Sequence, residues 1–197
     1  MNSQRSYKQG LAAVSRLWEQ NDYVAALAKV EEMRAAWPGN SHLHVLWASA
    51  LELQKKPTHG LDEAKQALQL ACEFDQTSPA GPIELGYFLD GVEDNPQAAA
   101  ESFADGIALA RKLLCEGLIG QAKAYLHLGK REECVGCVME VLEVLEQEAR
   151  AKRGWADHPD LDFVLGLKAL PAYVSHLKGP FAEPLRELLE DVRRPGV

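Results

Sequence analysis

The stretch "DYVAALAKVEEMRAAWPGN", residues 22–40, decides the fold of this chain. It follows the turn residues Asn21-Asp22 and ends at Pro38-Gly39-Asn40, where a helix cannot continue. Between these limits Ala26, Val30 and Met33 recur four and three residues apart, so they share one face of a helix. The stretch is therefore an amphipathic helix with a defined end.

The same spacing recurs further along the chain. A small residue is followed four positions later by a larger apolar residue, and three positions after that by a third residue of the same face. The three positions hold Ala26, Val30 and Met33; Ala64, Leu68 and Ala71; Ala99, Phe103 and Gly106; and Cys134, Val138 and Val141. Turn residues separate the segments, at 21–22, 38–40, 57–60, 78–79, 91–96 and 129–130. The pattern predicts a series of helical hairpins.

This arrangement resembles a tetratricopeptide repeat (TPR) array. The first unit, residues 7–40, is 34 residues long and closes at Pro38, and the other units correspond to 41–78, 79–114 and 115–150. The second unit ends late, at Pro79, and the third and fourth lack a terminal proline. The resemblance implies an all-α fold, a right-handed α-α superhelix of about four hairpins. Residues 1–6 are expected to form a flexible N-terminus.

The last part of the chain, residues 151–197, has a different pattern. It reads as a loop at 154–159 followed by shorter helices at 161–170, 171–178 and 181–192. An open helical stack must cover its last apolar face, and a segment this short buries little core alone. We therefore expect a C-terminal helical cap rather than a separate domain.

Composition limits the class of partner. The chain of 197 residues carries a formal net charge of -8, which argues against nucleic acid and against an anionic membrane surface. No segment approaches the roughly 18 apolar residues of a membrane span, and the N-terminus lacks an apolar core of signal-peptide length. We expect a cytoplasmic protein without membrane insertion, whose oligomeric state is open.

Cys134-x-x-Cys137 is the most suggestive chemical motif, because such a pair can bind zinc or undergo redox cycling. A structural zinc site needs four ligands, and only Cys115 could add to this pair. Cys134 also occupies the position that alanine holds in the other units, which favours a small core residue. His42 and His44 stand two apart on a predicted helix and so point to different faces, a poor metal pair.

No catalytic residue, metal site or cofactor is therefore predicted. The chain has no glycine-rich phosphate loop, serine nucleophile elbow or HExxH motif.

In TPR proteins the first helices of the hairpins line a concave groove that binds partner peptides or helices. The resemblance places the following residues in such a groove: Leu11, Ser15, Trp18, Val45, Ser49, Glu52, Ile83, Tyr87, Ile119 and Lys123. Leu11, Val45, Ile83 and Ile119 share one position and are all aliphatic. If exposed, they form an apolar stripe; the alternative is that the adjacent hairpin or the C-terminal segment covers them.

Acidic residues would border this stripe, at Glu19, Glu52, Glu84 and Asp90. An apolar stripe with an acidic rim suits an amphipathic helix or an apolar segment with basic flanks. Some TPR co-chaperones hold a carboxylate with a Lys/Asn/Arg clamp. Leu11, Ser15 and Leu46 stand where that clamp needs charged or amide donors, so no clamp is expected.

These features predict a non-enzymatic adaptor, scaffold or chaperone-like module that binds a protein or peptide partner. Two alternatives stay open. The chain could be an enzyme, or the regulatory subunit of one, built on a helical platform, or it could be a scaffold that assembles with itself.

Overall fold

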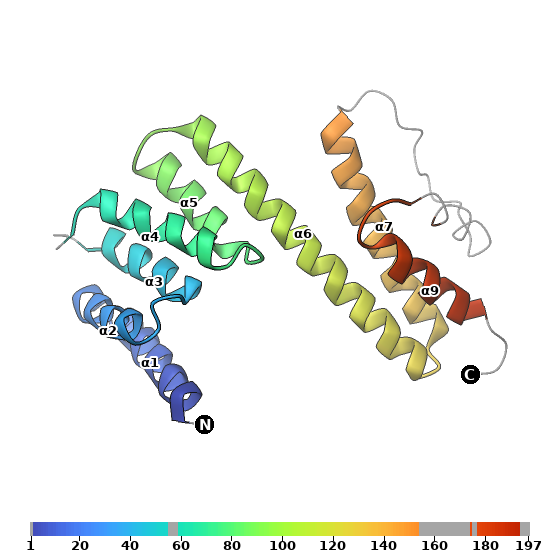
Figure 1. The fold of residues 1–197 in the computed structure, drawn as a ribbon, viewed down its shortest axis with the longest axis horizontal. Coiled ribbons are helices and arrows are strands. Elements are labelled where there is room, and N and C mark those ends of the chain that lie inside the picture. The colour runs from blue at the N-terminus through green and yellow to red at the C-terminus, as the bar shows by residue number, and fades with distance from the viewer. Residues whose placement is uncertain (1, 55–58, 154–173, 175–176, 194–197) are drawn as a thin grey trace. The chain divides into compact units, whose positions relative to one another are not determined.

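The computed structural model describes residues 2–54, 59–153, 174 and 177–193. Throughout these residues the chain is all-α, with eight helices and no strand (Figure 1). The helices are α1 (Asn2–Glu19), α2 (Tyr23–Ala36), α3 (Ser41–Glu52), α4 (Leu61–Phe74), α5 (Ala80–Gly91), α6 (Pro96–His127), α7 (Arg131–Arg153) and α9 (Ala182–Arg193). The predicted all-α, helical-hairpin fold class is confirmed. None of the described helices is long and apolar enough to cross a membrane.

The chain divides into two compact units, Met1–Ala110 and Arg111–Val197. The boundary lies inside α6, which continues without interruption from Pro96 to His127. Each unit has its own apolar core.

In unit 1 each of the helices α1 to α5 packs against the next, and α3 also packs against α5. The residues that repeat in the sequence supply the core: Ala26, Val30, Met33, Ala64, Leu68 and Ala71 are all buried. Fully burying a side chain such as Val30 contributes about 1.5–3 kcal/mol. The repeated spacing therefore marks the packing face of each hairpin's second helix.

Small residues allow neighbouring helices of unit 1 to approach closely. A Cβ atom added to Gly81 of α5 would lie 3.1 Å from the backbone nitrogen of Cys72 in α4. A Cβ added to Gly106 of α6 would lie 2.6 Å from Cγ1 of Ile83 in α5. Both contacts are tighter than ordinary van der Waals contact, so a larger residue at either crossing would force a neighbour to shift.

The turns follow the residues that the sequence singled out. Asp22, Asn40 and Asn95 cap α2, α3 and α6, each accepting a hydrogen bond from a backbone N–H at 3.1–3.2 Å. Asn21 and Asp94 precede two of these caps with positive φ angles of 57° and 51°, a conformation that asparagine and aspartate tolerate better than most residues.

Two boundaries differ from the expected ones. Helix α1 begins at Asn2, so residues 2–6, expected to be flexible, are helical. The expected boundary between the third and fourth units, at 114/115, falls within α6 rather than at a turn. The chain has no proline or turn cluster near that position, so nothing stops the helix there.

Unit 2 contains the rest of α6, α7 and α9. Val138 and Val141 of α7 share one core with Leu185 and Leu188 of α9, and α9 packs directly on α7. The helix expected over 181–192 is present as α9. The expected loop at 154–159 and helix at 161–170 lie outside the described residues, as does most of the helix expected at 171–178.

Candidate functional site

The residues predicted to line a groove in unit 1 lie on α1, α3 and α5. On α1, Leu11 and Trp18 are half-buried against the core, whereas Ser15 is exposed. On α3, Val45 is 7% exposed, and Ser49 donates a hydrogen bond to the Val45 carbonyl oxygen at 3.1 Å. These five side chains therefore offer little free apolar surface.

The remaining predicted residues lie in both units. Ile83 of α5 is half-buried against Gly106. Ile119 is 8% exposed and belongs to the core of unit 2, while Lys123 on the same helix is exposed. Val45 and Ile119 are covered by neighbouring helices, which was the alternative to an exposed stripe. They do not form an exposed aliphatic stripe.

Besides Ser15 and Lys123, the predicted groove and rim residues that reach the surface are acidic or aromatic. Glu52 of α3, Glu84 and Tyr87 of α5 and Asp90 of α5 form what we call the acidic face of unit 1. The side chain of Tyr87 is 63% exposed and its ring contacts Phe103 edge-on, with centroids 5.0 Å apart. Glu84, Tyr87 and Asp90 follow one another at spacings of three, which places them on one side of α5.

The negative charges of Glu52 and Glu84 are held in an unfavourable environment on this face. Partial burial raises the pKa of Glu52, and the nearby charge of Glu84 raises it further. Partial burial also raises the pKa of Glu84. Among the described residues neither carboxylate has an ion pair or a hydrogen bond. Among the described residues, the acidic face therefore has no counter-cation.

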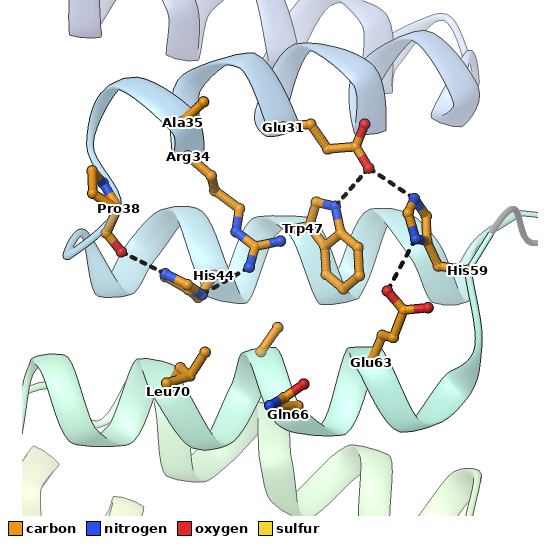
Figure 2. Close-up of a pocket in the computed structure, with 11 residues that line it drawn as sticks. Glu31, Arg34, Ala35, Pro38, His44, Trp47, His59, Glu63, Gln66 and Leu70 are labelled. Carbon is orange, nitrogen blue, oxygen red and sulfur yellow. Dashed lines mark hydrogen bonds and ion pairs between the residues drawn. The ribbon is translucent and has the colours of Figure 1, made fainter.

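A pocket of about 420 Å³ opens on another side of unit 1, between α2, α3 and α4 (Figure 2). It is lined by Glu31, Arg34, Ala35, Pro38, His44, Trp47, His59, Glu63, Gln66, Ala67 and Leu70. Since successive residues of a helix are rotated by about 100°, Trp47 lies about 160° around α3 from Ser49. The pocket and the predicted groove thus occupy opposite sides of α3.

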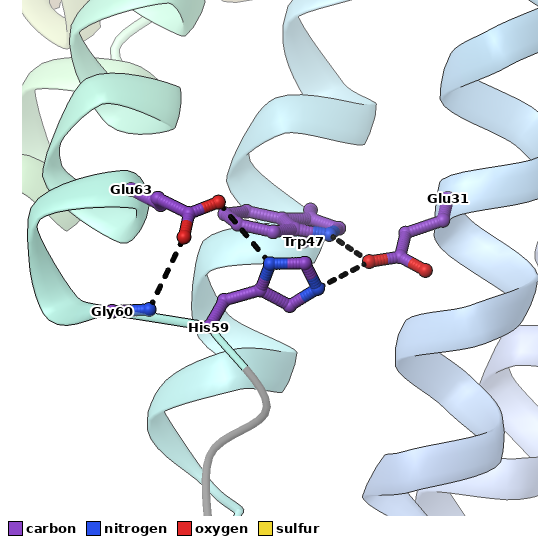
Figure 3. A network of polar contacts seen from close by, with 5 residues as sticks. All are labelled: Glu31, Trp47, His59, Gly60 and Glu63. Carbon is purple, nitrogen blue, oxygen red and sulfur yellow. Dashed lines mark hydrogen bonds and ion pairs between the residues drawn. The ribbon is translucent and has the colours of Figure 1, made fainter.

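A polar network crosses one end of the pocket (Figure 3). Oε1 of Glu31 accepts a hydrogen bond from Trp47 Nε1 at 3.2 Å and lies 2.9 Å from His59 Nε2. His59 Nδ1 lies 3.1 Å from Glu63 Oε2, and Glu63 Oε1 accepts a hydrogen bond from the Gly60 N–H at 3.3 Å. We call this set the Glu31–His59–Glu63 bridge; it joins α2 to α3 and to the start of α4.

The charge of the His59 ring decides how strong this bridge is. A neutral imidazole has one N–H and can donate to one carboxylate only, whereas an imidazolium donates to both. Both ring nitrogens face carboxylate oxygens. His59 thus lies between two carboxylates, one from α2 and one from α4.

At the other end of the pocket a cation rests on an aromatic wall. The Arg34 guanidinium carbon lies 4.6 Å from the Trp47 ring centroid, a cation–π contact. Arg34 Nη2 is 3.2 Å from His44 Nδ1, and His44 Nε2 is 2.8 Å from the Pro38 carbonyl oxygen. His44 is consequently neutral, with Nε2–H donating to Pro38 and Nδ1 accepting from Arg34.

The pKa of His44 agrees with this assignment. Burial lowers it, and the charge of Arg34 lowers it further, against the opposing effect of the hydrogen bond to Pro38. Burial also lowers the pKa of Arg34, partly offset by Glu31. Arg34 keeps its charge all the same, since the ordinary pKa of arginine lies far above neutral pH.

The pocket lies at a junction between hairpins, where α2, α3 and α4 meet. Its lining includes no serine, threonine, cysteine, tyrosine or lysine to act as a nucleophile. Both of its histidines are engaged by neighbouring groups. Sequence reasoning did not find this network; the one local signal was Trp47, whose buried indole N–H needs an acceptor.

The Cys134-x-x-Cys137 pair lies in the core of unit 2 together with Cys115. Burial raises the pKa of Cys134 and of Cys137, which keeps the thiols protonated and unreactive. The Cys137 thiol donates to Gln121 Oε1 at 3.7 Å. Within the described residues, no group of three or more His, Cys, Asp or Glu side chains is arranged to hold a metal ion.

Comparison with known proteins adds one structural likeness. No protein-family model matches the chain, and no curated protein matches it. Among solved structures, the crystal structure of MamA protein aligns with a TM-score of 0.43 and 14% sequence identity. The alignment covers 94% of this chain and 86% of that chain.

Proposed function

We propose that this chain is a TPR-like, non-enzymatic interaction module, and that the acidic face of unit 1 binds a basic segment of a partner protein. One observation carries the proposal. Glu84 lies close enough to Glu52, on a neighbouring helix, for its charge to oppose the ionisation of Glu52, and no described residue neutralises either carboxylate. A lysine or arginine of a partner would supply the missing charge.

The physical gain comes from relieving this repulsion. Bringing a cation near two carboxylates with raised pKa values favours their charged forms and forms charge-assisted hydrogen bonds. Tyr87, 63% exposed beside Glu84, adds an aromatic ring for a cation–π contact or for an apolar side chain. The net charge of -8 would also speed the approach of a basic partner.

The bound segment is a helix or an extended peptide whose basic residues flank apolar ones. Helices α3 and α5 pack side by side, so their exposed sides form a continuous surface for such a segment. Amphipathic helices and short peptides bind helical surfaces by placing a few anchors at regular spacing. Binding is expected to weaken as salt is added, because exposed charges are screened.

A peptide-display selection tests the proposal without knowledge of the partner. Wild-type protein should enrich peptides with lysine or arginine next to apolar residues. The double variant Glu52→Lys/Glu84→Lys should lose those peptides and enrich acidic ones. A matched control, Glu73→Lys on the exposed part of α4, should select the same peptides as wild type.

Two results would contradict the proposal. One is enrichment of the same peptides by the wild type and by the double variant. The other is a wild-type selection with no basic preference. Circular dichroism of each variant at the selection temperature confirms that a lost interaction does not reflect unfolding.

A further inference from the structure

Helix α6 exposes a row of apolar and small residues on its unit 2 part. The side chains of Leu113, Leu114 and Leu128 are 44%, 51% and 69% exposed. Between them lie Gly117, Gly120 and Ala124, which are also exposed. We call these six residues the α6 stripe. Leu128 follows the helix, since its N–H donates to the Ala124 carbonyl oxygen at 3.1 Å.

The stripe faces away from the core of its own unit. The residues of α6 that enter that core are Cys115, Leu118, Ile119 and Ala122. At about 100° per residue, Ala124 and Gly117 lie about 160–180° around the helix from Cys115. The stripe therefore lies on the side of α6 opposite the core that the described residues of unit 2 form.

The two glycines of the stripe have no packing role among the residues that the structure describes. A Cβ atom added to Gly117 or Gly120 would meet nothing within 4 Å. Glycine weakens a helix relative to alanine, because it loses more backbone freedom on folding. Without side chains at these positions, however, the backbone of another helix can approach closely.

Charged residues beside the stripe indicate what the other helix is. Glu116 and Lys123 are both exposed and stand seven residues apart, which places them on the same flank of α6. Among the described residues neither is in an ion pair. The midpoint of Glu116 and Lys123 falls between residues 119 and 120, and the midpoint of Leu113 and Leu128 between 120 and 121. The two midpoints are one residue apart, and each lies within half a residue of Gly120.

This symmetry is what a two-fold axis requires. In an antiparallel pair of identical helices, every contact occurs twice and equivalent flanks meet. An axis at Gly120 places Leu113 within one residue of the position opposite Leu128 of the partner subunit, and Glu116 within one residue of the position opposite Lys123 of the partner subunit. Gly120 meets its own copy at the centre, where the helices come closest.

We propose that two copies of this chain associate antiparallel through the α6 stripe. The residues of this pairing all belong to unit 2. One helix pair makes a small interface, so the equilibrium is expected to be reversible, with a dissociation constant in the micromolar range.

Sedimentation velocity of the full chain over a range of concentrations tests the association. Wild-type protein should pass from monomer to dimer as its concentration rises. The double variant Leu113→Glu/Leu128→Glu should weaken the dimer by about 100-fold or more, because four charges would enter an apolar contact. The control Val24→Glu replaces a side chain that is 61% exposed on α2 of unit 1 and should leave the equilibrium unchanged.

A wild-type protein that stays monomeric at millimolar concentration would overturn the proposal. So would a dimer that the Leu113/Leu128 variant leaves intact, because that dimer would use another surface.

Two further variants separate association from folding and test the antiparallel register. Gly120→Leu should keep or raise the melting temperature, since leucine favours helix more than glycine, yet abolish the dimer by preventing close approach. Glu116→Lys and Lys123→Glu should each weaken the dimer, whereas the double variant Glu116→Lys/Lys123→Glu should restore it. If the dimer of the double variant is no more stable than the dimer of either single variant, the antiparallel register is wrong.

Discussion

The indole N–H of Trp47 on α3 donates to Glu31 Oε1 on α2 at 3.2 Å, across the junction of two consecutive hairpins. Trp47 is 3% exposed, so its N–H has no alternative partner in solvent. Glu31 also faces His59, and one carboxylate thus serves two donors from the second hairpin. The junction between the two hairpins is therefore held by a specific polar contact as well as by apolar packing.

Replacing Glu31 should therefore destabilise unit 1. Glu31→Ala leaves the buried Trp47 N–H unpaired and removes one side of the bridge, so we expect a loss of about 1–3 kcal/mol in the free energy of unfolding. Urea unfolding followed by circular dichroism measures it. Glu32→Ala is the control: Glu32 has a 71% exposed side chain paired with Lys29, and its loss should cost no more than about 0.5 kcal/mol. Equal effects of the two substitutions would show that the junction does not depend on the Trp47 contact.

Unit 1 should lose stability in mild acid through His44. The pKa of His44 in the folded chain is below its ordinary value of 6.5, so the unfolded chain binds a proton more readily. The corresponding stability is fully present above about pH 6.5 and declines as pH falls through the lower, folded pKa. Urea midpoints at several pH values should fall below pH 6.5 in the wild type and fall less steeply in His44→Gln. If the urea midpoints of the wild type and of His44→Gln fall equally with pH, the assignment of a neutral His44 is wrong.

Glu52→Gln should separate stability from binding. Because the pKa of Glu52 is raised in the folded chain, its contribution to stability is fully present below the ordinary value of 4.5 and is lost as pH rises through the folded pKa. The neutral amide should therefore stabilise unit 1 near pH 7, by about 0.2–0.5 kcal/mol after solvent screening. The same variant should bind basic peptides less well. A variant that is both less stable and a weaker binder would indicate a structural role for Glu52.

The C-terminal helix is proposed to cap the stack. Leu185 of α9 is fully buried and Leu188 is 2% exposed, both against the core of unit 2. Ending the chain before Gly179 removes both side chains and uncovers Val138 and Val141, so the shortened protein should aggregate or lose helicity. Leu185→Ala should cost about 2–5 kcal/mol by leaving a cavity. A shortened chain that stays soluble, monomeric and equally stable would contradict the cap.

The helical spacing of small and apolar residues predicted the fold, because these residues pack between the helices. Ala26 and Ala64 are small since a neighbouring helix crosses them, and such positions recur with the period of the helix. The continuity of α6 was less apparent, because the alignment of repeats placed a boundary where the sequence itself has no helix-stopping residue. Local pattern identifies a helix more reliably than it identifies the helix's end.

The site was harder to predict, for a reason that Val45 illustrates. An aliphatic residue on a first helix can face a groove or the next hairpin, and only tertiary packing decides; in the structure Val45 is 7% exposed. The contact between Glu31 and Trp47 spans 16 residues and three different elements meet at the bridge. Polar contacts of this kind do not recur at a regular spacing, so the sequence pattern does not reveal them.

The Glu31–His59–Glu63 bridge has a consequence for cooperativity. In a linear stack, the terminal hairpin normally frays first, because it has a neighbour on one side only. Here the polar groups of the second hairpin, Trp47 and His59, depend on a carboxylate that the first hairpin supplies. Opening the first hairpin therefore exposes unpaired donors in the second, and the two should open together. Amide hydrogen exchange in α2 and α4 should accordingly report one shared opening free energy, and Glu31→Ala should split it into two.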